Sequence, residues 1–270
     1  MKSIYIHGTE PEEQERLSLL NRIINDACLR ELNLQKGECV LDVGSGLGQF
    51  TREMASTSGC RVVGLERSPE QLQTALRLAS EAGQADLVEF RQGDALEMPL
   101  EPDEWGSFDV VHTRFLLEHV PDPGAVVRQM ARACAPGGRV VLVDDDHDLL
   151  KLWPEDPAWD RLWRAYTDSY RAIGNDPIVG RRLVSLLVEA GLRPRRNTGI
   201  FFGSCQGHPS FQGLVDNLLG VVETAFGAMI SHGLLTDNEI AAGMGYAAAW
   251  RTLPDATLWY SAAWAEGIKT

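Results

Sequence analysis

The stretch from Val40 to Gly48 reads VLDVGSGLG, an apolar run that breaks into three glycines at alternate positions. A short run of this kind is typical of a buried strand that enters a tight loop. Glycine is favoured in such a loop because a side chain would hold the backbone away from a bound ligand. Residues 49–56 carry apolar side chains at helical spacing, so we predict a strand, a ligand-binding turn and a helix.

Strands continue to alternate with helices beyond this turn. After a first strand within residues 38–43, short apolar runs predict further strands at 61–65, 87–90, 108–112 and 139–143. An alternation sustained over about 100 residues implies a mostly parallel sheet that is covered by helices on both faces. The predicted fold class is therefore α/β with a doubly wound sheet.

Three helix starts are marked by a capping residue followed by proline. Ser68-Pro69 supplies an N-cap and a first-turn proline, and Gln71 completes a capping box. Asp122-Pro123 predicts a second helix start. Asp176-Pro177 predicts a third helix, which should end at Gly191.

The regular alternation of predicted strands and helices ends after Asp144. A stretch with Trp153, Trp159, Trp163, Tyr166 and Tyr170 is interpreted as an inserted helical lid, with plain core packing as the alternative. Two more strands are expected at 197–204 and 257–264, separated by a second helical insert at about 206–253. The predicted domains are a helical N-terminal cover (1–36), a Rossmann-like core (37–150), an insert with a helix (151–192) and a C-terminal part (193–270).

Composition limits the partners and the compartment. The chain has 270 residues and a formal charge of −13, whereas nucleic-acid binding usually draws on clustered lysine and arginine. We therefore expect no nucleic-acid partner. The first residues show no secretory apolar run, and no stretch approaches the roughly 20 apolar residues that span a bilayer, so we predict a cytoplasmic protein without a membrane span. The oligomeric state is left open.

Five cysteines are present, an odd number without a Cys-x-x-Cys pair. This spacing favours neither a disulfide framework nor a zinc site. We expect reduced cysteines that are mostly buried in the core. Their positions are Cys28, Cys39, Cys60, Cys134 and Cys205.

The glycine spacing helps to choose the ligand. A dinucleotide fingerprint places its third glycine three residues after the second, but here Gly48 follows Gly46 after two and Gln49 takes the expected place. Glu66 ends the second predicted strand, where a carboxylate can accept hydrogen bonds from a ribose diol. An adenosyl ligand therefore fits better than NAD.

Six ordered blocks extend this interpretation. They are Val40–Gly48, Gly64–Pro69, Gln92–Pro99, Phe108–Val111, Leu117–Pro123 and Pro136–Gly138. In these blocks the chain resembles the class I S-adenosylmethionine-dependent methyltransferases. It is similar in particular to the small-molecule branch that includes the ubiquinone and menaquinone biosynthesis enzymes. The resemblance implies a seven-stranded sheet in the order 3-2-1-4-5-7-6 with strand 7 antiparallel, and S-adenosyl-L-methionine as the cofactor.

The resemblance also implies roles for individual residues. The turn backbone would approach the methionyl part, and Thr113 and Arg114 would border it. Asp42 would order the turn or bind the ammonium group through water, and Glu66 would hold the ribose hydroxyls. Asp94 would accept from the adenine amino group, with the Ala95 amide donating to the ring. The full implied cofactor set is Asp42, Gly44, Ser45, Gly46, Gly48, Glu66, Arg67, Gln71, Asp94, Ala95, Thr113 and Arg114.

Methyl transfer needs few catalytic side chains, because alignment of the acceptor and exclusion of water do most of the work. A base near the methyl group would help an acceptor that loses a proton. His119 and His147 are the candidates, and His112, inside a strand, is expected to be structural. The run Asp144–Asp146 offers oxygen ligands for magnesium, but consecutive aspartates diverge, so we predict no metal site.

The predicted function is transfer of a methyl group to oxygen, nitrogen or carbon of a small, partly apolar or aromatic acceptor. Three alternatives stay open. The first is a non-catalytic subunit that binds an adenosyl ligand, and the second is an NAD-dependent oxidoreductase. The third is methylation of a protein or of RNA, which the acidic charge and the predicted inserts disfavour. Tyr5, Gln14 and Arg16 are expected to lie in a segment that covers the cofactor.

Overall fold

A computed structural model describes residues 24–270. The chain divides into two compact units, and each is described by itself. We call residues 24–145, 179–200 and 262–270 the core unit, and residues 146–178 and 201–261 the helical unit. The expected cofactor cover with Tyr5, Gln14 and Arg16 lies outside the described residues, and the four predicted domain bounds remain predictions.

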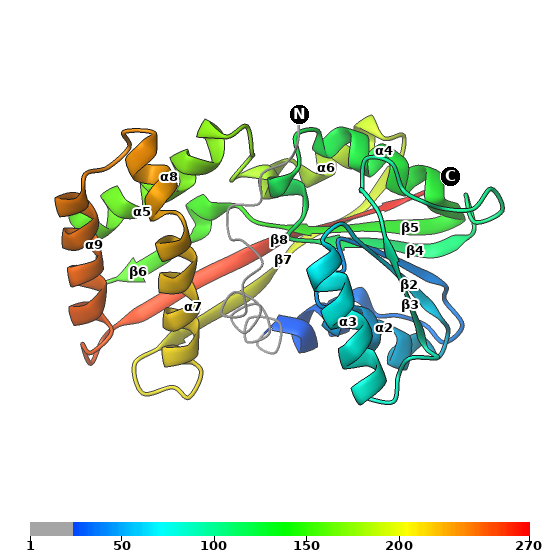
Figure 1. Ribbon diagram of the computed structural model, residues 1–270, viewed down its shortest axis with the longest axis horizontal. Coiled ribbons are helices and arrows are strands. Elements are labelled where there is room, and N and C mark those ends of the chain that lie inside the picture. Colours follow the sequence, from blue (N-terminus) through cyan, green and yellow to red (C-terminus); the bar gives the residue numbers. More distant parts are fainter. Residues whose placement is uncertain (1–23) are drawn as a thin grey trace. The chain divides into compact units, whose positions relative to one another are not determined.

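Five parallel strands form the centre of the core unit (Figure 1). The sheet has the order β3-β2-β1-β4-β5-β8-β6, and β7 pairs with β8. Strand β8 runs antiparallel to β5 through Ala263–Ile268. The predicted order is thus confirmed, with β7 and β8 as the sixth and seventh predicted strands. The bounds are β1 Val40–Val43, β2 Val62–Glu66, β3 Val88–Gln92, β4 Phe108–Arg114, β5 Cys134–Asp144, β6 Lys151–Trp153, β7 Arg193–Cys205 and β8 Thr257–Ile268.

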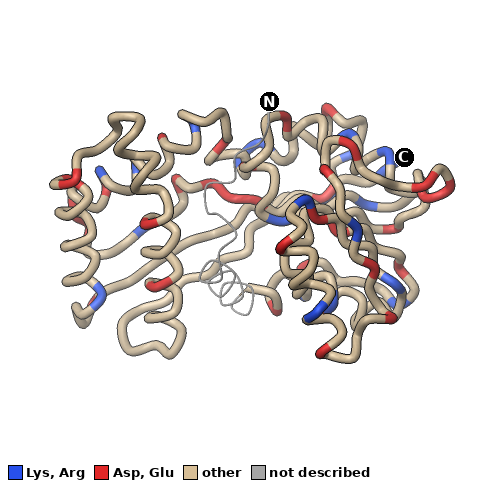
Figure 2. Tube along the Cα trace, in the orientation of Figure 1, with Lys and Arg blue, Asp and Glu red and all other residues tan. Residues whose placement is uncertain are grey.

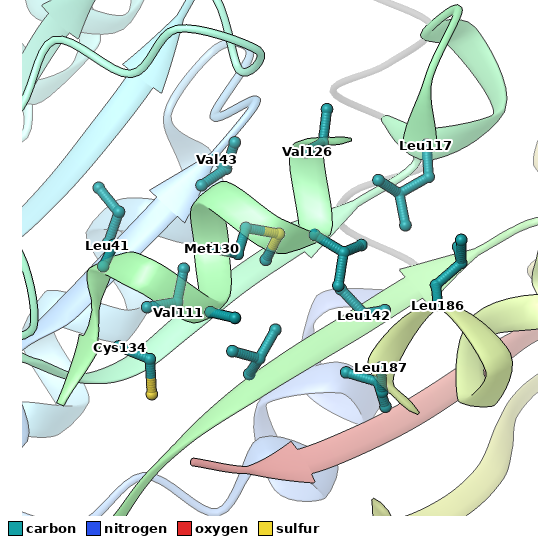
Figure 3. Close-up of a cluster of buried hydrophobic side chains, with 14 of the residues drawn as sticks. Leu41, Val43, Val111, Leu117, Val126, Met130, Cys134, Leu142, Leu186 and Leu187 are labelled. Carbon is teal, nitrogen blue, oxygen red and sulfur yellow. The ribbon is translucent and has the colours of Figure 1, made fainter. Parts of the chain in front are cut away.

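Helices cover both faces of this sheet. Helices α2 (Gln49–Ser58) and α3 (Pro69–Glu81) pack on β1, β2 and β3, and α4 (Pro123–Ala133) and α6 (Leu183–Glu189) pack on β4 and β5. On the other face, Leu41 of β1, Met130 of α4 and Leu187 of α6 belong to one buried apolar cluster (Figure 3). Residues 24–32 are also helical. The doubly wound α/β class is confirmed.

Two of the three marked helix starts are found. Ser68 accepts the Gln71 N–H and caps α3, and Asp122 accepts the Ala125 N–H and caps α4. The third expectation is wrong, because α6 begins only at Leu183, after a 3-10 turn at Val179–Arg182. The Asp176 carboxylate accepts the Ile178 N–H two residues on, which makes a local turn in place of a helix start.

The helical unit is organised around aromatic side chains. Its elements are a 3-10 turn at His147–Leu149, β6 Lys151–Trp153, α5 Pro157–Ala172, α7 Phe211–Thr224, α8 Phe226–Ser231 and α9 Asp237–Trp250. The stretch expected to be helical from Trp153 therefore begins as a strand, which pairs with residues 257–259 of β8. This strand gives the described chain an eighth strand that the sequence analysis did not predict. The lid role of the inserts stays a prediction.

One helical stretch has the length and composition of a membrane span. Phe211–Ser231 has 21 residues, and an 18-residue window within it has a mean hydropathy of 1.4, contrary to the expectation that no stretch comes near this length. The stretch is divided at Ala225 into α7 and α8. Phe211, Val215 and Val222 pack in the apolar cluster of the helical unit, as a helix of a protein core does. Length and hydropathy alone therefore do not indicate a span.

The cysteines are less buried than predicted. Within residues 24–270, which include all five, Cys28 and Cys134 are buried, Cys60 is half-buried, and Cys39 and Cys205 are exposed. Cys39 and Cys205 precede or end strands, where alternation turns every second side chain outward. The expectation of mostly buried cysteines is wrong.

Gly48 should be more sensitive to substitution than Gly59, the glycine at the other end of α2. Both have left-handed backbone, with φ 66° and 69°. An added Cβ at Gly48 would lie 2.2 Å from the Phe90 ring, whereas none of the described atoms lies within 4 Å at Gly59. We expect Gly48→Ala to lower the free energy of unfolding by about 2–5 kcal/mol and Gly59→Ala by about 1–2 kcal/mol. Urea unfolding of both variants checks this, and equal losses would contradict it.

Candidate functional site

The glycine turn lies at the carboxyl end of β1 in the core unit. Gly44, Gly46 and Gly48 have φ of 77°, 55° and 66°, a region that side chains rarely adopt. The N–H groups of Gly44 and Ser45 donate to the Leu65 carbonyl at 2.9 and 2.8 Å. The turn is therefore held against β2 by its own backbone.

Glu66 joins the turn to the next helix. One carboxylate oxygen, Oε2, accepts the Gly46 N–H at 2.9 Å, and Oε1 accepts the Ser68 N–H at 2.7 Å. Burial raises the pKa of this carboxyl group, and the two N–H donors oppose that effect. The carboxylate expected from the sequence thus lies at the turn, with lone pairs left for a ligand hydroxyl.

Asp42 lies under the turn, buried between β4 and α2. Its Oδ1 is 2.8 Å from His112 Nδ1, and its Oδ2 accepts the Thr51 hydroxyl at 2.6 Å. His112 is 1% exposed and lies opposite Asp42 in the strand register. The Asp42 carboxylate therefore fixes the start of α2 relative to the strand, and His112 has the structural surroundings that were expected for it.

Residues of the predicted adenine edge follow β3. The Asp94 carboxylate accepts the Leu96 N–H at 2.9 Å, which is ordinary turn chemistry, and its side chain is exposed. Ala95 comes next in this turn and is half-buried. Gln71 of α3 reaches the turn, since its Oε1 would lie 3.6 Å from a Cβ at Gly46. Arg67 is exposed, and its carbonyl accepts from Gln92.

Thr113 and Arg114 end β4. The buried Thr113 hydroxyl donates to the Val43 carbonyl at 2.8 Å, so it braces the two strands. The Arg114 guanidinium donates to Asn25 Oδ1 at 2.9 Å, with its carbon 4.4 Å from the centroid of the Phe50 ring. The resemblance implies that both residues border the methionyl end, and the structure gives their polar groups partners within the protein.

Sequence reasoning did not identify the role of Asp144. Its side chain is completely buried, and Oδ2 accepts the N–H groups of Leu116 and Leu117 at 3.1 and 2.7 Å. Oδ1 accepts the Asp145 N–H at 3.0 Å. Phe115, just before these donors, has φ 54°. Asp144 therefore shapes the segment after β4, and only its position at the end of a predicted strand hinted at this.

The two candidate bases lie in different surroundings. His119 is buried in the short 3-10 turn Leu117–His119, and its Nε2 is 3.3 Å from Glu118 Oε1. His147 belongs to the helical unit. The rings of Trp163, Tyr166, Tyr170 and Tyr260 surround it at centroid distances of 5.3 to 6.4 Å. The Tyr260 hydroxyl is 3.3 Å from His147 Nδ1.

The residues of the turn fit an adenosyl amino acid. Ser45 Oγ is buried without a hydrogen-bond partner within the described part of the chain, so a ligand could use it. Helix α2 begins at Gln49 without a side-chain cap, and an open helix N-terminus suits a carboxylate group. Together with the Glu66 carboxylate, these groups match the carboxylate and the ribose of one ligand.

Comparison with known proteins places the same segment among methyltransferases. Residues 41–142 match the family model described as a methyltransferase domain. The chain is 38% identical over 116 residues to tocopherol O-methyltransferase, chloroplastic, of Arabidopsis thaliana (43% of this chain, 32% of the relative). It is 37% identical over 138 residues to 27-O-demethylrifamycin SV methyltransferase of Amycolatopsis mediterranei (51% and 50%). The chain thus spans half or less of the length of the curated relatives that it matches first.

Solved structures agree on the fold. A SAM-dependent methyltransferase from Aquifex aeolicus superposes with a TM-score of 0.54 and 18% sequence identity, over 72% of this chain and 94% of that one. At this identity the similarity concerns the fold alone. The strand order and the glycine turn therefore define a Rossmann-like methyltransferase fold.

Proposed function

We propose that the chain is an S-adenosylmethionine-dependent methyltransferase that acts on a small molecule. One observation carries the proposal: the Glu66 carboxylate contacts the left-handed Gly46 in the segment that matches a methyltransferase domain. This arrangement suits a ribose beside a closely approaching backbone. The different glycine spacing of dinucleotide-binding turns makes the oxidoreductase alternative weaker.

The chain's own residues mainly position the reactants. A bound sulfonium donor supplies an activated methyl group, so the protein has to orient the acceptor in line and exclude water. Glu66 and the turn would hold the donor, and Asp144 would keep the segment after β4 in place. His119 is the better supported base because it lies in that segment, within the core unit. His147 stays a second candidate.

The acceptor is proposed to be partly apolar or aromatic. Relatives of this chain are named for methylation of tocopherol and of a rifamycin, which are small molecules with ring systems. Kinship with the ubiquinone and menaquinone branch is a proposal that the ordered sequence blocks support. The absence of a nucleic-acid partner and a cytoplasmic location are proposals too. In Figure 2 Lys and Arg are interspersed with Asp and Glu along the trace, and this mixture suits a protein that does not bind nucleic acid.

Titration calorimetry with S-adenosylhomocysteine, S-adenosylmethionine and NAD tests the cofactor. We expect saturable binding of both adenosyl ligands. Gly46→Arg should lower the affinity at least 100-fold, because the arginine side chain would fill the space in which the ligand approaches the turn backbone. Gly83→Arg is the matched control. Gly83 also has a left-handed φ, 65°, and no described atom lies within 4 Å of an added Cβ. The affinity of Gly83→Arg for S-adenosylhomocysteine should stay within threefold of that of the wild type.

The outcomes separate the alternatives. Binding of NAD alone would overturn the proposal in favour of an oxidoreductase. Binding of adenosyl ligands combined with no turnover, across acceptors that range from small phenols to large polycyclic compounds, would favour the non-catalytic alternative. Methyl transfer that depends on Gly46 would support the proposed function.

A further inference from the structure

Two of the cysteines lie side by side in the core unit, at the amino ends of neighbouring strands. Val40 pairs with Val62 in the parallel register of β1 and β2. Cys39 comes just before Val40, and Cys60 lies two residues before Val62. This register, carried one residue back, places Arg61 beside Cys39 and makes Cys60 its diagonal neighbour. A strand spacing of about 4.8 Å and a rise of about 3.3 Å per residue give a diagonal Cα separation of about 5.8 Å, within the range of about 4.4–6.8 Å that a disulfide spans.

Further contacts hold the two thiols together. The Gly37 N–H donates to the Ser58 carbonyl at 2.9 Å, so the segments that lead into the cysteines are also paired. The Cys39 N–H donates to Asp109 Oδ2 at 2.9 Å, which fixes its backbone. Burial and the neighbouring Cys60 thiol raise the pKa of Cys39, as expected for two thiols close to each other. Cys39 is exposed and Cys60 half-buried, so a small reagent reaches the pair.

We propose that Cys39 and Cys60 are a redox pair that forms a reversible disulfide. The bond closes a loop of about 20 residues that contains the glycine turn and α2. The inference is independent of the proposed function, because it rests on the placement and exposure of the two thiols and on no contact with a cofactor.

The reaction balances with a low-molecular-weight disulfide as the oxidant. One cysteine thiolate attacks a sulfur of the small disulfide and releases one small thiol. The second cysteine thiolate then attacks the mixed disulfide and releases the other small thiol. One S–S bond is consumed and one is formed, and the two cysteine protons end on the two released thiols.

The Cys39–Cys60 disulfide should stabilise the folded protein and leave the cofactor site open. A cross-link between Cys39 and Cys60 restricts the unfolded chain, which raises the melting temperature. Gly46 and Glu66 lie at the carboxyl ends of the same strands, away from the cysteines. We therefore expect the affinity for S-adenosylhomocysteine to change by less than threefold on oxidation.

The experiment incubates the full chain with oxidised glutathione and compares Cys39→Ser, Cys60→Ser and Cys205→Ser. Burial, the Cys60 thiol and Asp109 raise the pKa of Cys39, so the reaction is run at pH 8.5 to provide thiolate. The readouts are the thiol count after denaturation, peptide mass mapping and the melting temperature. Cys205 is the matched control because it is also exposed.

In the wild type and in Cys205→Ser we expect loss of two thiols to a Cys39–Cys60 link, with a rise in melting temperature of about 5 °C or more that dithiothreitol reverses. Cys39→Ser and Cys60→Ser should show neither the link nor the rise. Glutathione attached to Cys39 or Cys60 without a link, or a link with an unchanged melting temperature, would overturn the proposal.

Discussion

Replacement of Asp144 by alanine is expected to lower the free energy of unfolding by about 3–5 kcal/mol. The carboxylate accepts the N–H groups of Leu116, Leu117 and Asp145 inside a completely buried site. Each buried donor that loses its acceptor costs about 1–3 kcal/mol, and partial relaxation reduces the total. Chemical unfolding measures the loss. Because the segment after β4 would lose its anchor, affinity for S-adenosylhomocysteine should fall as well.

The control is Asp122→Ala, which removes an exposed capping aspartate at the start of α4. Loss of that cap should cost about 1 kcal/mol and leave ligand affinity unchanged. A result in which the Asp144 and Asp122 variants lose equal stability would show that burial of the three donors does not matter.

The loss of stability in Asp144→Asn should depend on pH, and the raised pKa of Asp144 gives the direction. Burial and the nearby Glu118 and Asp145 carboxylates raise the pKa of Asp144 well above its usual value. The unfolded chain loses this proton near pH 3.9, whereas the folded chain keeps it to higher pH. The contribution of Asp144 to stability is therefore full below the unfolded pKa and declines as pH rises toward the folded pKa. Asparagine does not titrate, so the stability deficit of Asp144→Asn should be larger at pH 4 than at pH 7.

Local chemistry made parts of the fold predictable. The start of α3 follows from Ser68 and Pro69, because an N-cap and a first-turn proline act within one helical turn. The glycine turn follows equally, since a left-handed backbone at Gly46 excludes most other residues. In both places the residues that cause the feature lie within a few positions of it in the sequence.

Features that depend on distant partners were not predictable. Strand β6 has three residues and exists through pairing with residues 257–259, about 100 positions away. The Thr113 hydroxyl donates to the Val43 carbonyl of the neighbouring strand, so its position at the end of β4 alone does not reveal its role. Cys39 and Cys60 become neighbours only because β1 and β2 pair. Sequence reasoning located the ends of strands, and the use of each side chain there depends on which strands become neighbours.

Glu66→Gln is expected to weaken binding of S-adenosylhomocysteine by about 100-fold. The carboxylate already accepts the N–H groups of Gly46 and Ser68, and it is proposed to accept ribose hydroxyls with its other lone pairs. An amide offers one acceptor oxygen, and its NH₂ group would face a backbone donor. Calorimetric titration measures the loss, and Glu81→Gln, an exposed position at the end of α3, should bind as the wild type does.

The pH profile of binding distinguishes a contact with the ligand from support of the turn. Burial raises the pKa of Glu66, so this carboxyl group gains a proton at a higher pH than an exposed glutamate does. Ribose hydroxyls donate to the ionised form, and hence wild-type affinity should fall as pH decreases from 8 to 5. The Gln variant has no such proton to gain, so its weaker affinity should stay level over this range. A wild-type profile parallel to that of the variant, or a Gln variant within threefold of the wild type at pH 8, would remove Glu66 from the proposed ribose site.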